Sequence, residues 1–258
     1  AHVQKASAVN ADETSWRENK SKAWLWVAAT GTVTVFVIAA RRSAEVAKDL
    51  LGDAFRGVLT TDRWSAYNWV EVARRQLCWS HLLRDFQSWV DGGGDGKQLG
   101  LQLLREARRM FRWWHRVRDG TMPRSAFAKK MRAVQLNVAT LLTQASECRT
   151  RRVSGMATEM LKLEWALWTF VYTEGVEPTN NFGERQIRHA VLWRKGSFGT
   201  DSAAGSRFVE RMLTTITTLR QQERNALEYV TAACAAALKG APAPSLLPGQ
   251  AHVTPAMA

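Results

Sequence analysis

An uncharged run of 18 residues, Ala23 to Ala40, limits the possible folds of this chain more than any other segment. Its length is near the lower limit for a helix that spans a membrane. Thr30-Gly31-Thr32 interrupts the middle of the run, however, and the second half, Thr32 to Ile38, is rich in β-branched residues. Two strands joined by a tight turn account for both features. We therefore expect a buried hairpin here and no membrane anchor.

The segments around this run predict an α/β sheet. A strand over residues 3–14 carries Asp12 towards its end, and a short buried strand over 57–61 delivers Asp62 at its C-terminal end. The other expected elements are a helix over 43–51, a helix that begins at Ser65, a strand over 76–79 and a helix through Trp89. This order is typical of a mixed α/β sheet, in which ligands gather at strand ends.

A glycine-rich break from Asp91 to Gly96 divides the pattern. From Lys97 to Tyr172 the sequence turns helical, with a second helix expected from Ser125 to Leu142 and a third from Ser154 to Phe170. Two further helices are expected over 203–222 and 225–239. We therefore expect a core split between residues 1–91 and 173–240, a helical insertion over 92–172, and a loosely ordered tail over 241–258.

Composition narrows the class of protein. A hydrophobic content of 46% supports a substantial core, and a net charge of +13 favours an anionic partner such as nucleic acid. Charge alone does not separate a nuclease from a passive binder or a ribosomal protein. The three cysteines are far apart and give no disulfide framework, as in a reducing cytoplasm. The first residue is not methionine, so we expect a fragment of a longer protein, and no signal peptide is visible.

The segment from Glu177 to Lys195 predicts a helix that faces an anionic ligand. Pro178 disfavours a helix interior, and Asn180 and Asn181 are good N-cap residues. One face then collects, at steps of three and four, Glu184, Ile187, Arg188, Val191 and Lys195. Glu184 has two interpretations at this point: it completes a capping box with Asn181, three residues earlier, or it is a catalytic acid.

Three acids fall where the expected elements converge: Asp12, Asp62 and Glu184. Carboxylate oxygens within mutual reach are the ligands that Mg²⁺ takes, together with several waters. Two such ions can activate a water or a 3′-hydroxyl and stabilise the leaving oxygen of a phosphodiester. The chain has 23 acidic residues, so spacing alone does not select this triple.

Five short motifs make the interpretation specific. They are Ala11-Asp-Glu-Thr14, Thr61-Asp-Arg-Trp-Ser-Ala-Tyr67, Cys78-Trp-Ser-His81 with Arg84, Thr179-Asn-Asn-Phe-Gly-Glu-Arg-Gln-Ile-Arg188, and Arg194-Lys195. In this order they resemble the landmarks of the DDE transposases of the insertion-sequence 66 family, from about residue 10 to about residue 248. The Asn-Asn-x-x-Glu-Arg-x-Ile-Arg block is the most specific part.

The resemblance implies a ribonuclease H-like core, two Mg²⁺ or Mn²⁺ ions, and cleavage and joining of element-end DNA. It implies that Asp12, Asp62 and Glu184 are the catalytic triad and the metal ligands. We expect a homo-oligomer on DNA in the bacterial cytoplasm, associated with the nucleoid. We expect the family's N-terminal DNA-recognition modules to lie outside the given sequence.

Cations near the acids are candidates for phosphate contacts, although a solvated helix face explains each one equally well. The candidates are Arg63, Arg185, Arg188, Arg194 and Lys195, together with Asn181. Arg63 and Trp64 stand where the family usually has a glycine and an aromatic residue, and we expect Arg63 to pair with the neighbouring acid or to contact phosphate. Two further basic clusters lie at 105–118 and 149–152.

The tryptophans divide into two groups. Trp24, Trp26, Trp165 and Trp168 are expected in the core, whereas Trp64 and Trp193 lie beside proposed site residues, where they can stack on unpaired bases.

Cys78-x-x-His81 is half of a possible zinc site, but a structural Zn²⁺ takes four ligands. We expect core residues at a strand-to-helix junction instead. Two rival functions share the charge pattern. One is a non-catalytic DNA-binding relative of a transposase, and the other is a nuclease that cuts without joining.

Overall fold

The computed structural model describes residues 1–247, and its contacts divide the chain into two compact units. The first unit combines the N-terminal segment Ala1–Gly57 with the C-terminal segment that begins at Phe182, and the second unit is Val58–Asn181. The two ends of the sequence therefore fold together, while the middle of the sequence forms a body of its own.

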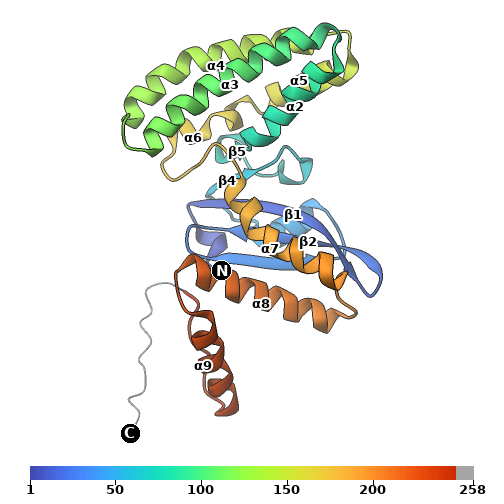
Figure 1. Ribbon diagram of the computed structural model, residues 1–258, viewed down its shortest axis with the longest axis vertical. Helices are drawn as coiled ribbons and strands as arrows, with labels where there is room; N and C mark the ends of the chain where they lie inside the picture. Colours follow the sequence, from blue (N-terminus) through green and yellow to red (C-terminus); the bar gives the residue numbers. More distant parts are fainter. Residues whose placement is uncertain (248–258) are drawn as a thin grey trace. The chain divides into compact units, whose positions relative to one another are not determined.

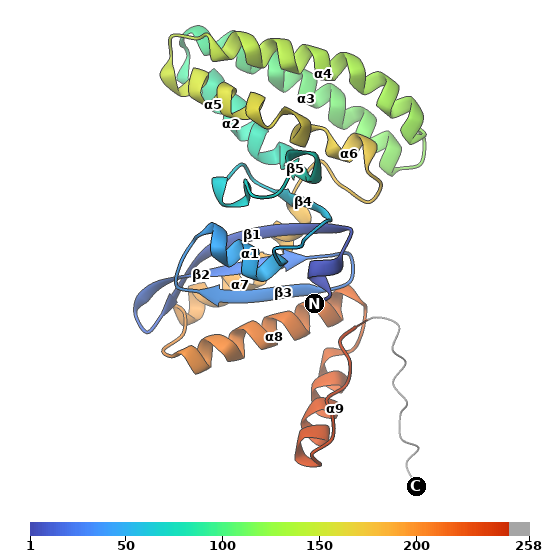
Figure 2. The same cartoon turned by 180° about the vertical axis from the view of Figure 1, so that it is seen from behind.

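The first unit contains an antiparallel sheet in the order β3-β2-β1, with β1 and β2 labelled in Figure 1 and all three strands in Figure 2. Its strands are β1 (Ala8–Glu18), β2 (Ser21–Ala29) and β3 (Thr34–Ala39). Asn19 and Lys20 have φ of 47° and 62°, the left-handed values that a two-residue hairpin turn requires. Between β2 and β3, the Thr30 hydroxyl oxygen accepts the N–H of Val33 at 2.9 Å. The hairpin predicted from the uncharged run is confirmed.

Helices cover both faces of this sheet. Helices α7 (Asn181–Ser197) and α8 (Ala203–Gln221) lie on one face, and α1 (Ala44–Leu51) lies on the other (Figure 2). The buried cluster on the α7 and α8 side consists of Trp16, Ala23, Leu25, Val27, Phe36, Ile187, Ala190, Val209 and Leu213. Phe36 points into this cluster, so the adjacent residues Val35 and Val37 point to the α1 side, where they line a hollow with Val46 and Leu50.

Helix α8 supplies hydrogen-bond acceptors to the free edge of β3. The N–H groups of alternate β3 residues donate to α8 side chains four positions apart: Thr34 to Thr218, Phe36 to Thr214 and Ile38 to Glu210, at 3.1, 3.0 and 2.6 Å. The two spacings match, because four helical residues rise about 6 Å and two strand residues about 6.6 Å. An edge that would otherwise invite pairing with another chain is thereby occupied.

Helix α9 (Ala226–Leu238) follows α8, so the two C-terminal helices predicted from the sequence are confirmed. The segment after α9 is held by side chains of this region. The Tyr229 hydroxyl donates to the carbonyl of Pro244 at 2.7 Å, and Arg224 Nη2 donates to that of Ser245 at 3.1 Å. Most of the predicted loose tail, residues 248–258, lies outside the described residues. No helix in residues 1–247 is long and apolar enough to cross a membrane.

The second unit joins a parallel strand pair to a set of helices. The strands are β4 (Val58–Thr61) and β5 (Arg75–Leu77). The helices are α2 (Trp79–Gly92), α3 (Lys97–Arg118), α4 (Arg124–Ser146), α5 (Arg151–Lys162) and α6 (Thr169–Tyr172). With antiparallel pairs in one unit and a parallel pair in the other, the mixed α/β class is confirmed, as is the helical character of residues 97–172.

Three local predictions were wrong. The helix expected from Ser65 is a single 3-10 turn that ends at Tyr67. The third long helix of the middle block is broken after Lys162 into a 3-10 segment and the short α6, because Leu163 leaves helical geometry. This break rotates Trp165 outwards, so it is 72% exposed, whereas Trp168 is 4% exposed as expected.

Of the two other tryptophans expected in the core, Trp26 is fully buried. Trp24 is only half-buried, with the cations of Lys22 and Arg42 each 5.1 Å from its ring centroid. The Trp24 ring is therefore only partly in the core, and it also contacts two cations.

The glycine-rich break is fixed to the start of α5 by one carboxylate. Asp95 accepts the N–H of Arg149 and the hydroxyl of Thr150, both at 2.6 Å. The hydroxyl bond from Thr150 is the main reason that the pKa of Asp95 is lowered from its ordinary value. This contact joins the loop after α2 to the turn before α5.

Candidate active site

Asp12 lies on the face of the first unit's sheet that α7 and α8 cover. It is opposite Val27 in the β1–β2 register, and opposed residues of an antiparallel pair point to the same face. Val27 belongs to the buried cluster under these helices, as does Trp16, which shares the side of Asp12 on β1. The N–H of Glu13 donates to Asp12 Oδ1 at 2.9 Å, and the Asp12 side chain is half-buried.

The neighbouring acid, Glu13, points to the opposite face. Its side chain is 3% exposed, and its Oε1 lies 2.5 Å from Arg42 Nη2. An acid buried with a cation of its own has a structural role here. Of the two adjacent acids in this motif, Asp12 is therefore the one on the α7 side.

Glu184 lies in the first turn of α7, at the border between two faces of the helix. The residues Gly183, Ile187 and Ala190 are buried, and Ile187 and Ala190 pack against the sheet. The outward face carries the exposed cations Arg185, Arg188 and Lys195. Glu184 is half-buried between them. The start of α7 at Asn181 confirms the predicted helix.

The position of this start bears on the capping-box interpretation. Because α7 begins at Asn181, the cap position is Asn180, which is buried. Glu184 is then four residues beyond the cap, whereas a capping box needs three. With α7 beginning at Asn181, Glu184 lies one position beyond the place of a capping-box acid.

The far end of α7 is fastened to β1. Arg194 Nη1 donates to the hydroxyls of Thr14 and Ser15 at 3.0 and 2.8 Å, and also to the carbonyl of Ser15. Thr14 lies two residues after Asp12 on the same side of β1. The helix that carries Glu184 and the strand that carries Asp12 are thus joined by side-chain hydrogen bonds as well as by the apolar cluster.

The loop after α7 completes this attachment. Thr200 bridges to Glu18, and the N–H of Asn19 donates to the Thr200 carbonyl at 2.8 Å. Gly199 has φ of 120°, and a Cβ atom there would lie 2.3 Å from the carbonyl oxygen of Arg17. Only glycine fits this close approach.

Asp62 belongs to the second unit, where it directly follows β4. Its Oδ1 accepts the N–H of Trp64 at 3.0 Å, an Asx turn that fixes the side chain at the strand end. Below this turn lies Arg75 of β5, fully buried, which is paired with Leu59 in the β4–β5 register. Arg75 Nη2 donates to the Asp62 carbonyl at 3.4 Å, and Nη1 donates to Asn68 Oδ1 at 2.8 Å.

Burial lowers the pKa of Arg75 to about 10, and the negative charge of Asp62 opposes this shift. The guanidinium therefore remains charged at neutral pH, and it stabilises the turn that presents Asp62. Arg75 was not predicted from the sequence, because it directly precedes the strand expected over 76–79 and an arginine at such a position is typical of the protein surface.

Arg63 stands where the family usually has a glycine, and it forms an ion pair with a residue of α2. Its Nη2 lies 2.7 Å from Asp85 Oδ2, and both side chains are about three-quarters buried, with 22% and 27% exposed. The structure thus gives this arginine a carboxylate partner other than Asp62. Trp64 is half-buried and meets Tyr67 edge to face, with the ring centroids 5.8 Å apart.

Two of the sequence motifs meet within the second unit. Cys78, at the junction of β5 and α2, is 1% exposed, and its sulfur accepts the N–H of Asn180 at 3.1 Å. The hydroxyl of Ser80 donates to Asn181 Oδ1 at 3.1 Å. The prediction that Cys78 is a core residue at a strand-to-helix junction is confirmed. His81 follows in the first turn of α2 and is half-buried.

The structure therefore places two of the three predicted acids, Asp12 and Glu184, on elements that pack together, and it places Asp62 at a strand end in the other unit. Comparison with known proteins adds one finding. A family model described as Transposase IS66 family matches residues 1–207, which include all three acids. The searches of curated proteins and of solved structures found no match.

Proposed function

The chain belongs to the transposase IS66 family, and on that premise we propose that it is a DDE-type catalytic domain that cuts and rejoins DNA strands. The proposed reaction is cleavage at insertion-sequence ends followed by strand transfer into a target. The observation that carries the proposal is that Asp12 and Glu184 come from β1 and α7, which share one buried cluster. A ribonuclease H-like fold is part of the proposal and is supported by the antiparallel strands that precede β4.

The three acids fit a divalent metal. Asp12, Asp62 and Glu184 are all half-buried, so each combines a fixed side chain with access to water. Carboxylates that leave room for several waters suit Mg²⁺ or Mn²⁺. Two such ions, when bound, activate a water or a 3′-hydroxyl and stabilise the leaving oxygen. We assign Asp12 and Asp62 to hold both ions and Glu184 to complete the second one.

Other residues of the chain position the DNA and the acids. Arg185, Arg188 and Lys195 face outwards on α7 beside Glu184, where they would contact backbone phosphates. Arg194 and Arg63 already have partners inside the chain, Thr14 and Asp85, and would act mainly by holding α7 and α2 in place. Asn181 is exposed at the start of α7 and remains a candidate phosphate contact. Homo-oligomeric assembly on DNA in the bacterial nucleoid belongs to the same proposal.

A nicking and strand-transfer assay on labelled element-end DNA tests this function. Glu184→Gln should reduce cleavage about 100-fold or more, because a lost metal ligand costs several kcal/mol of transition-state stabilisation. Glu228→Gln is the matched control, since Glu228 also lies in the first turn of a helix, α9, and is exposed to solvent. DNA affinity should be nearly the same for both variants. Full cleavage by Glu184→Gln, or equal loss in both variants, would overturn the proposal.

A further inference from the structure

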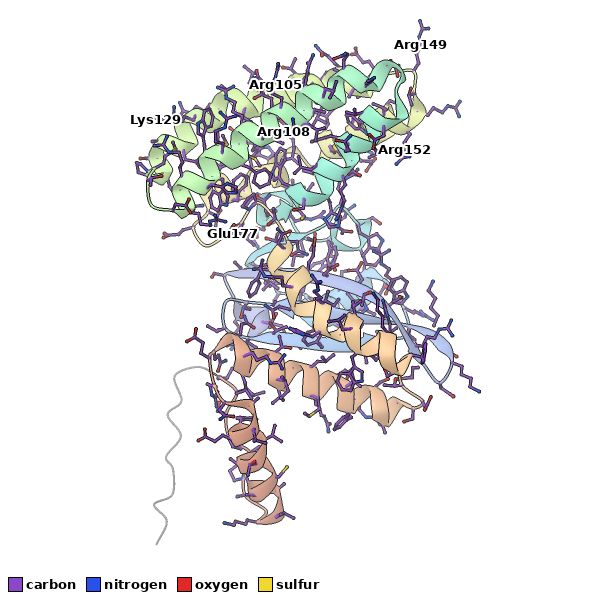
Figure 3. The ribbon with its side chains drawn as sticks, in the orientation of Figure 1. Arg105, Arg108, Lys129, Arg149, Arg152 and Glu177 are labelled. Carbon is purple, nitrogen blue, oxygen red and sulfur yellow. The ribbon has the colours of Figure 1, made fainter. Side chains whose placement is uncertain are left out.

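The solvent-facing side of α3 carries a straight row of cations. Arg105, Arg108, Arg112 and Arg116 follow one another at steps of three, four and four, and all four are exposed. The opposite side of the helix is buried through Gly100, Leu103, Leu104, Ala107, Met110 and Trp114. Figure 3 shows Arg105 and Arg108 on this helix. These four arginines are named the α3 arginine row.

The charge around the row is unbalanced. Residues 97–162 contain 15 lysines and arginines but only four acidic residues. Among the described residues, none of the row's arginines has an ion pair with an acid. The nearest acid on the helix, Glu106, is 6% exposed and pairs with Arg109 at 3.5 Å, so it does not neutralise the row.

The cationic surface continues onto α4. Arg109 of α3 and Lys130 of α4 both lie over the ring of Trp113, at 4.8 and 5.1 Å from its centroid. Lys129, labelled in Figure 3, and Arg132 are also exposed, in the first half of α4. Like charges three and four residues apart oppose helix stability. Repulsion among these cations therefore destabilises the free folded chain, and a bound anion would relieve that repulsion.

We propose that the α3 arginine row binds the phosphates of a DNA duplex along its backbone, without reading the base sequence. From Arg105 to Arg116 the helix rises about 16 Å, the length of about five base pairs. Each arginine guanidinium can donate two parallel hydrogen bonds to phosphate oxygens. A rigid helix holds the four arginines in a row, so less conformational entropy is lost when these bonds form. The inference rests on the proposed function only in taking DNA as the partner. It adds a contact surface that involves none of the three acids.

Salt-dependent DNA binding of the full chain tests the proposal. The variant is Arg105→Gln/Arg108→Gln/Arg112→Gln, and the matched control is Arg207→Gln/Arg211→Gln/Arg220→Gln, which removes the same charge from exposed positions of α8. Anisotropy of a labelled duplex of arbitrary sequence is measured in EDTA at several salt concentrations. The row variant should bind at least about tenfold more weakly near 0.1 M salt, with a log–log salt slope reduced by about 0.9 for each lost contact.

A charge-preserving variant separates contact from folding. Arg105→Lys/Arg108→Lys/Arg112→Lys should retain most of the affinity and the salt slope, and all variants should melt near the wild-type temperature. An unchanged slope in the glutamine variant, or an equal loss in the α8 control, would overturn the proposal. Tighter binding to duplex RNA than to DNA, lost in the same variant, would also overturn it. Because EDTA removes divalent ions, failure here is independent of whether the acids are catalytic.

Discussion

The fully buried guanidinium of Arg75 donates to the backbone carbonyl of the half-buried Asp62 at the end of β4, at 3.4 Å. The same guanidinium bonds Asn68 Oδ1, so one side chain fixes both ends of the turn that follows the strand. The charge of Asp62 favours the protonated arginine in spite of its burial. Arg75 is thus a positioning residue for the proposed metal ligand.

The first prediction concerns this pair. We expect Arg75→Met to lower kcat for DNA cleavage while the DNA dissociation constant stays unchanged, because the Asp62 turn loses its support. The melting temperature should also fall, because the substitution removes one partner and leaves the Asp62 carbonyl and Asn68 Oδ1 without this donor, so cleavage is measured well below the melting temperature of the variant. Arg75→Lys should restore part of the activity. A change in KM alone, or activity lost only in proportion to unfolding, would show that Arg75 is merely structural.

The second prediction concerns the edge of β3. Thr218→Val keeps the shape of the side chain but removes the acceptor of the Thr34 N–H and the donor to the Thr34 carbonyl, both at 3.1 Å. Leaving these buried groups unpaired should destabilise the chain by about 1–3 kcal/mol in urea unfolding. Thr215→Val, on the same helix, should have little effect. Equal effects of the two substitutions would contradict the role given to α8.

The third prediction concerns the loop that fastens α7. Gly199→Ala should destabilise the first unit by about 1–3 kcal/mol, because φ is 120° and the new Cβ would clash with the Arg17 carbonyl. It should also reduce cleavage, since α7 carries Glu184. Gly196→Ala has open space around it and should be neutral or stabilising. Thermal unfolding of the two variants, measured side by side, checks the difference. A neutral Gly199→Ala would show that the loop is not held to β1.

The fourth prediction is a pH dependence. The pKa of Asp95 is lowered in the folded chain, chiefly by the Thr150 hydroxyl. A carboxyl with a lowered folded pKa contributes stability above its unfolded value, near 3.9 for aspartate, and that contribution is lost as the pH falls through the folded value. The stabilities of wild type and Asp95→Asn should therefore converge as the pH falls below about 4. A constant difference over this range would contradict the role of Asp95.

Much of the fold follows from local patterns. The uncharged run predicts β2 and β3 because an interrupted β-branched sequence favours a hairpin, and the helices expected over 43–51 and 125–142 correspond to α1 and α4. The prediction of short elements is less accurate because it depends on few residues. The four residues from Ser65, for example, do not distinguish a 3-10 turn from the start of a helix. Trp165 was misplaced because a single departure from helical geometry at Leu163 changes the direction of every later side chain.

The candidate site was likewise predicted from the sequence only in part. The three acids were selected by their motifs, and α7 was predicted from its cap residues. The support of the acids depends on contacts between distant segments and has no local signal. Arg75 is buried because β5 pairs with β4, and Arg194 bonds to Thr14 across 180 positions of the sequence. Such partners are found only when the chain is folded.

The most direct test of the account is a Mn²⁺ titration of the purified chain by calorimetry, with Asp12→Asn, Asp62→Asn and Glu184→Gln measured beside wild type. Asp49→Asn, an exposed acid on α1, is the control. The account predicts two bound ions for wild type and Asp49→Asn, with weaker or fewer ions in each of the other three variants and unchanged duplex binding in EDTA. Wild-type metal binding in all three variants would contradict the proposal that these acids hold the metal ions.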